Sequence, residues 1–303
     1  MKQSSNLIEE LKYQLKSGPM TNRLIIYNVF VFAVIQLISG IISLTSVKET
    51  ILLNLTENVF TLDTNLFGFI QKPWGIFTSI FSHFSLWHLF FNMLFLFFSG
   101  QMFEQFFDKR RLWQTYLFGG ISGGILEIFA HFLFPSFQNS EHIVVGASGS
   151  IMAIFTALAF HSPNIKVSLF GIIPVRIYFI AIFFLLNDLI GISNPQDNVA
   201  HFAHLGGAIF GMISIQSLHS KNNILSVLGN FFDSIYKFIK GNKSKSNTNK
   251  RFKTDEEYNL EKNNRQKKTD EILDKISKSG YESLTKAEKD FLFNQSKNNK
   301  PEK

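Results

Sequence analysis

The fold of this chain is set by two apolar runs that each contain one reactive polar group. Residues 146–161 read GASGSIMAIFTALAFH, and residues 201–219 read HFAHLGGAIFGMISIQSLH. Ser148 lies near the start of the first run and His204 near the start of the second. A hydroxyl and an imidazole are expensive to place in membrane-spanning helices, so such residues indicate a function. The pair predicts a nucleophile and its base.

Composition agrees with a chain built mostly of lipid-facing helices. Of 303 residues, 46% are hydrophobic and 35 are Phe, and the apolar residues concentrate between about Arg23 and Leu218. The chain has no cysteine, which excludes disulfides, a thiol nucleophile and a Cys-based zinc site. The first apolar run, 24–44, follows a polar segment and lacks a clean cleavage site, so we interpret it as a retained span rather than a signal peptide.

Six stretches approach the length of about 20 residues that crosses a bilayer. They lie at roughly 24–46, 84–103, 112–134, 146–161, 172–192 and 201–219. The sequence therefore predicts an all-α membrane protein, a compact six-transmembrane-helix bundle with both termini on one side.

Basic residues indicate which side that is, because cytoplasmic loops carry an excess of Lys and Arg. Those expected on the same side as the termini are Lys2, Lys12, Lys16, Arg23, Lys109, Arg110, Arg111, Lys166 and Arg176. The loops expected on the other side hold only Lys48 and Lys72. Both termini are therefore predicted to be cytoplasmic.

This orientation brings four polar groups to one outward-facing layer. The fourth and sixth spans run from outside to inside, with Ser148 and His204 each near the beginning. The second span runs the same way and carries His88 and Asn92 at spacing i, i+4, which places them on one helical face. These two side chains, with the backbone N–H of Ser148, can supply the hydrogen-bond donors that a tetrahedral intermediate needs.

Glycines around the pair favour close helix packing. Gly146 and Gly149 flank the serine, and Gly207 and Gly211 form a small-xxx-small face below His204. Each feature alone has a structural explanation: small residues are common at helix interfaces, and His88 with Asn92 can be an interhelical hydrogen-bond pair worth about 1 kcal/mol. The order and matching depth of all four groups favour catalysis.

Together these motifs resemble the rhomboid intramembrane serine proteases of bacterial type. The resemblance covers roughly 22–218 and rests on three motifs: His83-Phe-Ser-Leu-Trp-His88-Leu-Phe-Phe-Asn92, Gly146-Ala147-Ser148-Gly149, and Ala203-His204-Leu205-Gly206-Gly207 continuing to Gly211. It implies a Ser148–His204 catalytic dyad without a carboxylate, with His88 and Asn92 in the oxyanion hole. Gly100-Gln-Met-Phe-Glu104 looks like the family's helix-connecting element.

The resemblance also implies an activity. It is that of a serine endopeptidase that cleaves single-pass membrane proteins near the outer face, with a small residue before the scissile bond and no metal or organic cofactor. Membrane lipids are the other expected partner, and nucleic acid is not, because acidic residues intersperse the basic tail. Composition favours a bacterial plasma membrane. The alternatives are a non-catalytic rhomboid-like protein that binds or escorts membrane proteins, and, with less support, a transporter.

Two positions depart from the family pattern. Trp74 is followed by Gly75 where many members have an arginine, so the anchoring of the first outer loop, 47–75, is in question. One turn after the nucleophile stands Met152 where many members stack an aromatic ring on the histidine. A less rigidly held imidazole is the expectation there.

Further ionisable groups lie in the predicted spans. Glu127 and His131 are spaced i, i+4, and either form a mutually satisfied pair or anchor the first outer loop. Asp188 is not expected to complete a triad, because the resemblance implies a dyad, and His201 is expected in a loop. With no His-Glu-x-x-His and no facial His set on one or two helices, no metal site is predicted.

The remaining chain divides by composition. We expect a cytoplasmic segment at 1–22, the protease domain at 23–219, an amphipathic membrane-surface helix at 220–241, a disordered basic linker at 242–268 and a small helical hairpin at 269–303. Thr285 and Glu288 read as a capping box that begins the second helix of the hairpin.

Overall fold

The computed structural model contains two compact units, which are described separately. One comprises residues 19–243, and the other comprises 1–18 with 244–303. The structure describes residues 7–44, 56–138, 143–169, 173–194, 197, 199–218, 220, 222–239 and 255–298.

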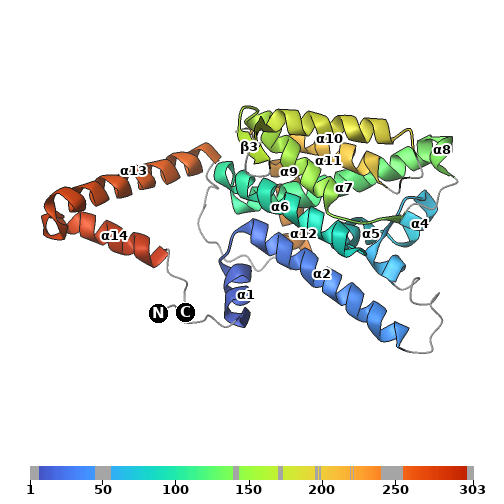
Figure 1. Cartoon of the computed structure of the whole chain (residues 1–303), viewed down its shortest axis with the longest axis horizontal. Helices are drawn as coiled ribbons and strands as arrows, with labels where there is room; N and C mark the ends of the chain where they lie inside the picture. The colour runs from blue at the N-terminus through green and yellow to red at the C-terminus, as the bar shows by residue number, and fades with distance from the viewer. Residues whose placement is uncertain are drawn as a thin grey trace. The chain divides into compact units, whose positions relative to one another are not determined.

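The larger unit is a helical bundle with apolar helices of two lengths (Figure 1). Within the described residues, three helices are long and apolar enough to cross a membrane: α2 Met20–Ser43, α6 Leu86–Phe106 and α7 Lys109–Leu133. Three more are shorter: α9 Ser148–His161, α10 Ile177–Gly191 and α11 His201–Ser214. A helix of 14 residues is about 21 Å long at about 1.5 Å per residue, which is less than the roughly 30 Å of a hydrocarbon core.

Helices α7, α9 and α11 pack most closely together and form the centre of the bundle (Figure 1). Glycine makes this possible where α11 crosses α9. A Cβ atom at Gly207 would clash with the carbonyl oxygen of Gly149, and one at Gly211 would clash with that of Ala153. A Cβ at Gly149 would lie 3.0 Å from the Ala203 carbonyl oxygen. The predicted small-xxx-small face therefore lies at this contact.

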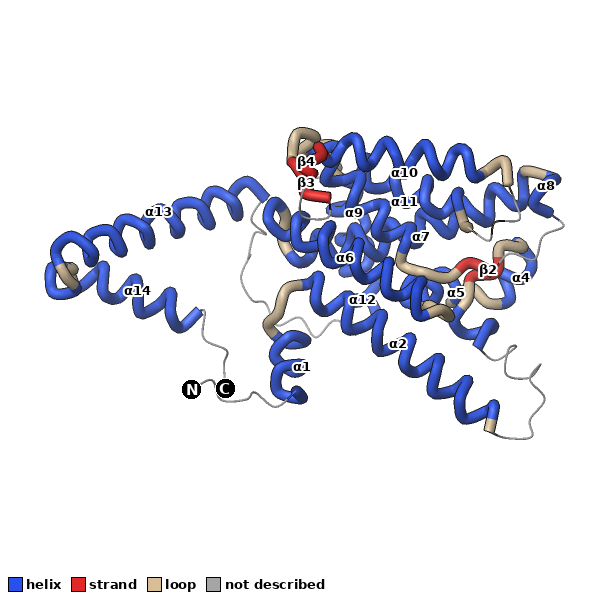
Figure 2. Tube along the Cα trace, in the orientation of Figure 1, coloured by secondary structure: helices blue, strands red, loops and turns tan. Residues whose placement is uncertain are grey.

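Two short strand pairs lie at opposite ends of these helices (Figure 2). Strand β1 Leu62–Asp63 pairs antiparallel with β2 Ile143–Val144, and β3 Lys166–Leu169 pairs antiparallel with β4 Ile173–Arg176. The connections carry short helical segments, among them α4 Leu66–Gln71, α5 Gly75–Thr78, η1 Ser79–Phe81 and α8 Pro135–Gln138.

The helices differ from the predicted spans at their ends. The fifth span was expected at 172–192, but α10 begins at Ile177 because β4, which contains Pro174, precedes it. The first was expected from residue 24, but α2 begins at Met20. The reason is that the Glu104 carboxylate accepts hydrogen bonds from the Met20 and Thr21 amides at 2.8 and 3.1 Å. Glu104 thus joins α6 to α2, as the helix-connecting role implied.

The described part of the first outer loop is anchored without the family's arginine. The Trp74 indole donates to the Asn58 carbonyl at 2.9 Å, and the Thr78 hydroxyl donates to the Val59 carbonyl at 2.6 Å. A Cβ at Gly75 would clash with the Thr61 carbonyl oxygen, so glycine permits this close approach. Hydrogen bonds from side chains to backbone carbonyls therefore hold this loop. Residues 47–55 of the expected loop lie outside the described residues.

Helix α12 Ile224–Ile239 differs from the membrane-surface helix expected there. Leu225 is buried among residues of α7 and α11, and the Phe232 ring lies 5.5 Å from that of Phe118. Arg110 pairs with Asp233 at 3.0 Å. This part of the apolar face packs on the bundle, because burial against protein satisfies it as well as a membrane surface does.

The smaller unit contains α1 Leu7–Lys16, α13 Asp255–Ser279, η2 Tyr281–Ser283 and α14 Lys286–Asn298. The linker expected to be disordered at 242–268 is helical from Asp255, where good helix formers carry i, i+4 pairs such as Glu261–Arg265; residues 242–254 lie outside the described residues. The capping box is confirmed, since the Thr285 amide donates to Glu288 at 2.6 Å and the Glu288 amide donates to the Thr285 hydroxyl at 3.3 Å.

Candidate active site

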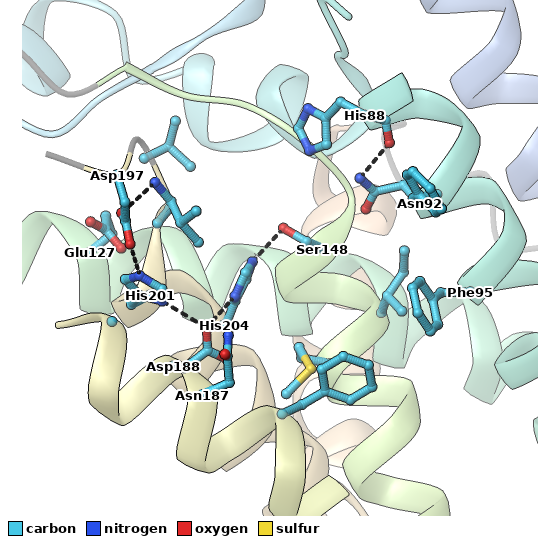
Figure 3. Close-up of a pocket in the computed structure, with 18 of the residues that line it drawn as sticks. His88, Asn92, Phe95, Glu127, Ser148, Asn187, Asp188, Asp197, His201 and His204 are labelled. Carbon is cyan, nitrogen blue, oxygen red and sulfur yellow. Dashed lines mark hydrogen bonds and ion pairs between the residues drawn. The ribbon is translucent and has the colours of Figure 1, made fainter. Parts of the chain in front are cut away.

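Ser148 and His204 meet across the contact between α9 and α11. Ser148 is the first residue of α9, and His204 lies in the first turn of α11. The serine Oγ lies 2.8 Å from Nε2 of the histidine, within hydrogen-bond reach (Figure 3). Gly146, two residues earlier, has φ +120°, a backbone conformation that favours glycine and sharply turns the chain into the helix. The structure therefore brings the expected pair together at a helix start.

Asp188 is the residue that sequence reasoning left out of this pair. It lies on α10, with 4% of its side chain exposed, and its Oδ1 is 2.7 Å from Nδ1 of His204 (Figure 3). The geometry is that of a carboxylate that orients an imidazole whose other nitrogen faces a serine. The available signal was an ionisable residue inside an apolar helix, which is a functional hypothesis by default.

His201 also differs from expectation. It was expected in a loop, but it is the first residue of α11 and is buried. Its Nδ1 lies 2.8 Å from Asp188 Oδ1, and its Nε2 lies 2.9 Å from Asp197 Oδ2. The reason is that α11 begins directly beside α10, so both histidines of its first turn reach the same carboxylate.

His88 and Asn92 line the same cavity on the other side of Ser148 (Figure 3). Asn92 is buried, and its amide nitrogen donates to the His88 carbonyl at 2.9 Å. A Cβ at Gly146 would lie 2.8 Å from the His88 ring, so the imidazole sits directly against the loop before the serine. His83 is buried, and its ring centroid is 4.9 Å from that of His88, edge to face. His83 thus packs against the His88 side chain and limits its movement.

The cavity has a volume of about 670 Å³ and is bordered by α6, α9, α10 and α11. Met152 lines this cavity and is buried. It stands at the position where the family resemblance implied an aromatic ring. We expected the His204 ring to be held loosely beside this methionine. Instead, the ring is held by the hydrogen bond that its Nδ1 makes to the Asp188 carboxylate, which accepts it.

Glu127 holds the start of α11 rather than the first outer loop. Its Oε2 accepts a hydrogen bond from the Ala203 amide at 2.8 Å, next to His204 in the chain. Its Oε1 lies 3.5 Å from Nδ1 of His131, so the pair expected from their spacing is also present. A carboxylate at a helix N-terminus satisfies an otherwise unbonded amide and fixes the helix position.

Metal-ligand atoms also gather here, which the spacing of the histidines did not predict. One nitrogen each of His201 and His204 and one oxygen of Asp188 all lie within 4.8 Å of one another. They come from α10 and α11, so two neighbouring helices do provide a set of this kind.

Fold and site define a class: a mostly helical, multi-pass integral membrane protein with a serine–histidine pair in a cavity between its helices. Comparison with known families gives the particular one. Residues 71–221 match the model described as "Rhomboid domain", and this part of the chain belongs to that family. The C-terminal residues 253–298 match a family of unknown function, DUF6576.

Individual relatives agree with this assignment. RHOMBOID-like protein 12, mitochondrial, of Arabidopsis thaliana is 31% identical over 45% of this chain and 44% of its own length. RHOMBOID-like protein 1 of the same plant is 31% identical over 52% of this chain and 37% of its own length. A third, named "Inactive RHOMBOID-like protein 8", is 35% identical over 46% of this chain and 36% of its own length. The chain thus spans less than half of each of these relatives.

Proposed function

We propose that this protein is an intramembrane serine endopeptidase with six membrane-spanning helices, formed by α2, α6, α7, α9, α10 and α11. The observation that carries the proposal is the 2.8 Å approach of Ser148 Oγ to His204 Nε2 at the wall of a cavity. A serine hydroxyl is a weak nucleophile until a base takes its proton, and the histidine is placed to do so. The family membership of this region supports the same activity.

The reaction is acyl transfer in two halves. Ser148 Oγ attacks the scissile carbonyl carbon while His204 Nε2 accepts the hydroxyl proton. His204 then gives that proton to the leaving amine, and the C–N bond breaks to leave an acyl-serine ester. A water molecule, deprotonated by His204, attacks the ester. The tetrahedral intermediate that forms then collapses, which releases the new carboxyl end of the substrate, and His204 returns the proton to Ser148 Oγ.

Asp188 is a positioning residue in this scheme. A carboxylate on Nδ1 keeps the proton of a neutral imidazole on that nitrogen, which leaves the lone pair of Nε2 facing the serine. It also stabilises the imidazolium that forms when His204 accepts a proton. We therefore propose a Ser148–His204–Asp188 triad in place of the dyad that the family resemblance implied.

The attack of Ser148 places a negative charge on the former carbonyl oxygen of the substrate, and hydrogen-bond donors from α9 and α6 are expected to stabilise this oxyanion. The backbone N–H of Ser148 is at the start of α9, where amides have no intrahelical partner. We propose that the Asn92 amide and the His88 ring complete the set, since both line the cavity with Ser148. Asn92 would exchange its bond to the His88 carbonyl for one to the oxyanion.

Substrates are proposed to be single-pass membrane proteins that unwind locally near the outer face, because a peptide bond within a helix is shielded from attack. The short α9 and α11 support a recessed site: if their inner ends reach the cytoplasmic face, Ser148 and His204 lie below the outer one. The charge distribution supports cytoplasmic termini. Location in a bacterial plasma membrane stays a prediction from composition alone.

The competing function is a non-catalytic rhomboid-like protein that binds or escorts membrane proteins. It is kept because one relative is named inactive. The two functions differ in whether Ser148 is nucleophilic, which can be measured without knowing a substrate.

The test is labelling of the detergent-solubilised full chain with a fluorophosphonate probe. Wild type is expected to label, and Ser148→Ala and His204→Ala are expected to stay dark. Ser150→Ala is the matched control, because Ser150 lies on the same helix, is buried, and its hydroxyl has no hydrogen-bond partner among the described residues. It should label like wild type. A folded wild type that stays dark would favour the binding protein.

A further inference from the structure

The histidine proposed as the base is also part of a cluster with the composition of a transition-metal site. His201 Nδ1, His204 Nδ1 and Asp188 Oδ1 converge between α10 and the first turn of α11 (Figure 3). The side chains are 7%, 18% and 4% exposed, so the cluster is largely shielded from water and His204 is its most accessible member. We propose that these three side chains form an inhibitory Zn²⁺ site, an inference that rests on the proposed function of His204.

The donor set suits zinc. Two imidazole nitrogens and one carboxylate oxygen match sites with three protein ligands, in which water takes the fourth position. At about 2.0–2.1 Å from zinc, tetrahedral ligand atoms are about 3.3–3.4 Å apart. Asp188 Oδ1 now lies 2.7 and 2.8 Å from the two nitrogens, so each gap would open by about 0.6 Å on binding. Rotations of the three side chains would have to supply this change, starting from ligand atoms that all lie within 4.8 Å of one another. Mg²⁺ and Ca²⁺ prefer all-oxygen sets and are not expected here.

The surroundings also suit a bound cation. His201 Nε2 lies 2.9 Å from Asp197 Oδ2, which is the carboxylate–histidine arrangement that orients metal-bound imidazoles. Glu127 lines the same cavity and adds a further acidic group. The cavity, with its volume of about 670 Å³, borders all three ligands and provides both an entry path and space for the fourth, water ligand.

Binding of Zn²⁺ at this site would prevent His204 from acting as the proposed catalytic base. A neutral imidazole carries one proton, and coordination of zinc through Nδ1 of His204 places that proton on Nε2. Nε2 then donates to Ser148 Oγ and cannot accept the hydroxyl proton. For His204 the step is a shift of tautomer with no redox change, and removal of the ion restores the arrangement in which Nδ1–H faces Asp188. Zinc would therefore act as a reversible inhibitor.

Direct binding is the first test, and it is independent of proteolysis. Zinc is titrated calorimetrically into the metal-stripped full chain carrying Ser148→Ala, with Mg²⁺ as the ion control. One Zn²⁺ per chain is expected. Adding Asp188→Ala or His201→Ala should abolish binding, and Asp197→Asn should weaken it about 10- to 100-fold. His161→Ala, at the far end of α9, is the matched control and should bind as before.

Inhibition is the second test. Zinc should block fluorophosphonate labelling of wild type, a chelator should restore it, and the labelling that His201→Ala retains should resist zinc. Absence of binding, or binding and inhibition that survive His201→Ala, would overturn the proposal. The two proposals fail separately. Zinc binding in a chain that never labels would refute only the protease function, and labelling without zinc binding would refute only the metal site.

Discussion

Replacement of Asp188 by Asn tests whether a carboxylate orients the base. The substitution keeps the size and shape of a side chain whose Oδ1 lies 2.7 Å from His204 Nδ1, but it removes the charge. A hydrogen bond to a charged group contributes about 1.5–3 kcal/mol. At about 1.36 kcal/mol per tenfold change in rate, its loss slows the reaction about 10- to 150-fold. An amide that turned its N–H toward the imidazole would favour the wrong tautomer and add to this loss.

The measurement is the second-order rate constant of fluorophosphonate labelling in detergent, followed by cleavage of a model substrate in liposomes. The loss should fall on kcat, with KM changed less than about threefold, because Asp188 is expected to act in the transition state. Asn187→Ala is the matched control, because Asn187 is next to Asp188 on α10, is exposed and lines the same cavity. A labelling rate for Asp188→Asn within about threefold of wild type would show that the histidine is oriented without the carboxylate, and would restore the dyad.

Two further outcomes concern stability and pH. Gly207→Ala places a Cβ against the backbone of Gly149 and should lower the unfolding free energy in detergent by about 1–3 kcal/mol. Gly40→Ala, with open space around its Cβ, should leave it unchanged or raise it by up to about 1 kcal/mol, and equal losses would contradict the packing argument. Lys275, 2.9 Å away, lowers the pKa of Glu288 to about 2. Because this folded-state pKa is below the unfolded value of about 4.3, the stabilisation is present above pH 4.3 and is lost as pH falls through about 2. Hydrogen exchange of α14 should report it, and Glu288→Gln, which lacks the charge at every pH, should remove this pH dependence.

Much of the helical organisation was readable from the sequence. Apolar length located six helices, and the spacing of His88 and Asn92 placed them on one face, because helix periodicity is a local property of the chain. Helix ends were predicted less well. They depend on partners far away in sequence, such as Glu104 at the start of α2, and on strand pairing such as that of β3 with β4.

In the C-terminal part of the chain, too, local patterns were predicted and long-range contacts were not. The capping box of Thr285 and Glu288 was recognised because its partners are three residues apart. The apolar face of α12 was also visible as a pattern, but the pattern cannot say what covers that face. Only tertiary structure packs Phe232 against Phe118, more than a hundred residues away in the chain.

At the site, the sequence by itself determined the chemical groups. Ser148 and His204 were identified because a hydroxyl and an imidazole in apolar helices need a reason, and the flanking glycines predicted close packing. Tertiary structure alone decided that Asp188 reaches His204 and that His201 shares the same carboxylate. The contact depends on where α10 lies against α11, and a hydrogen bond of 2.7 Å requires an accuracy in that placement that no sequence spacing encodes.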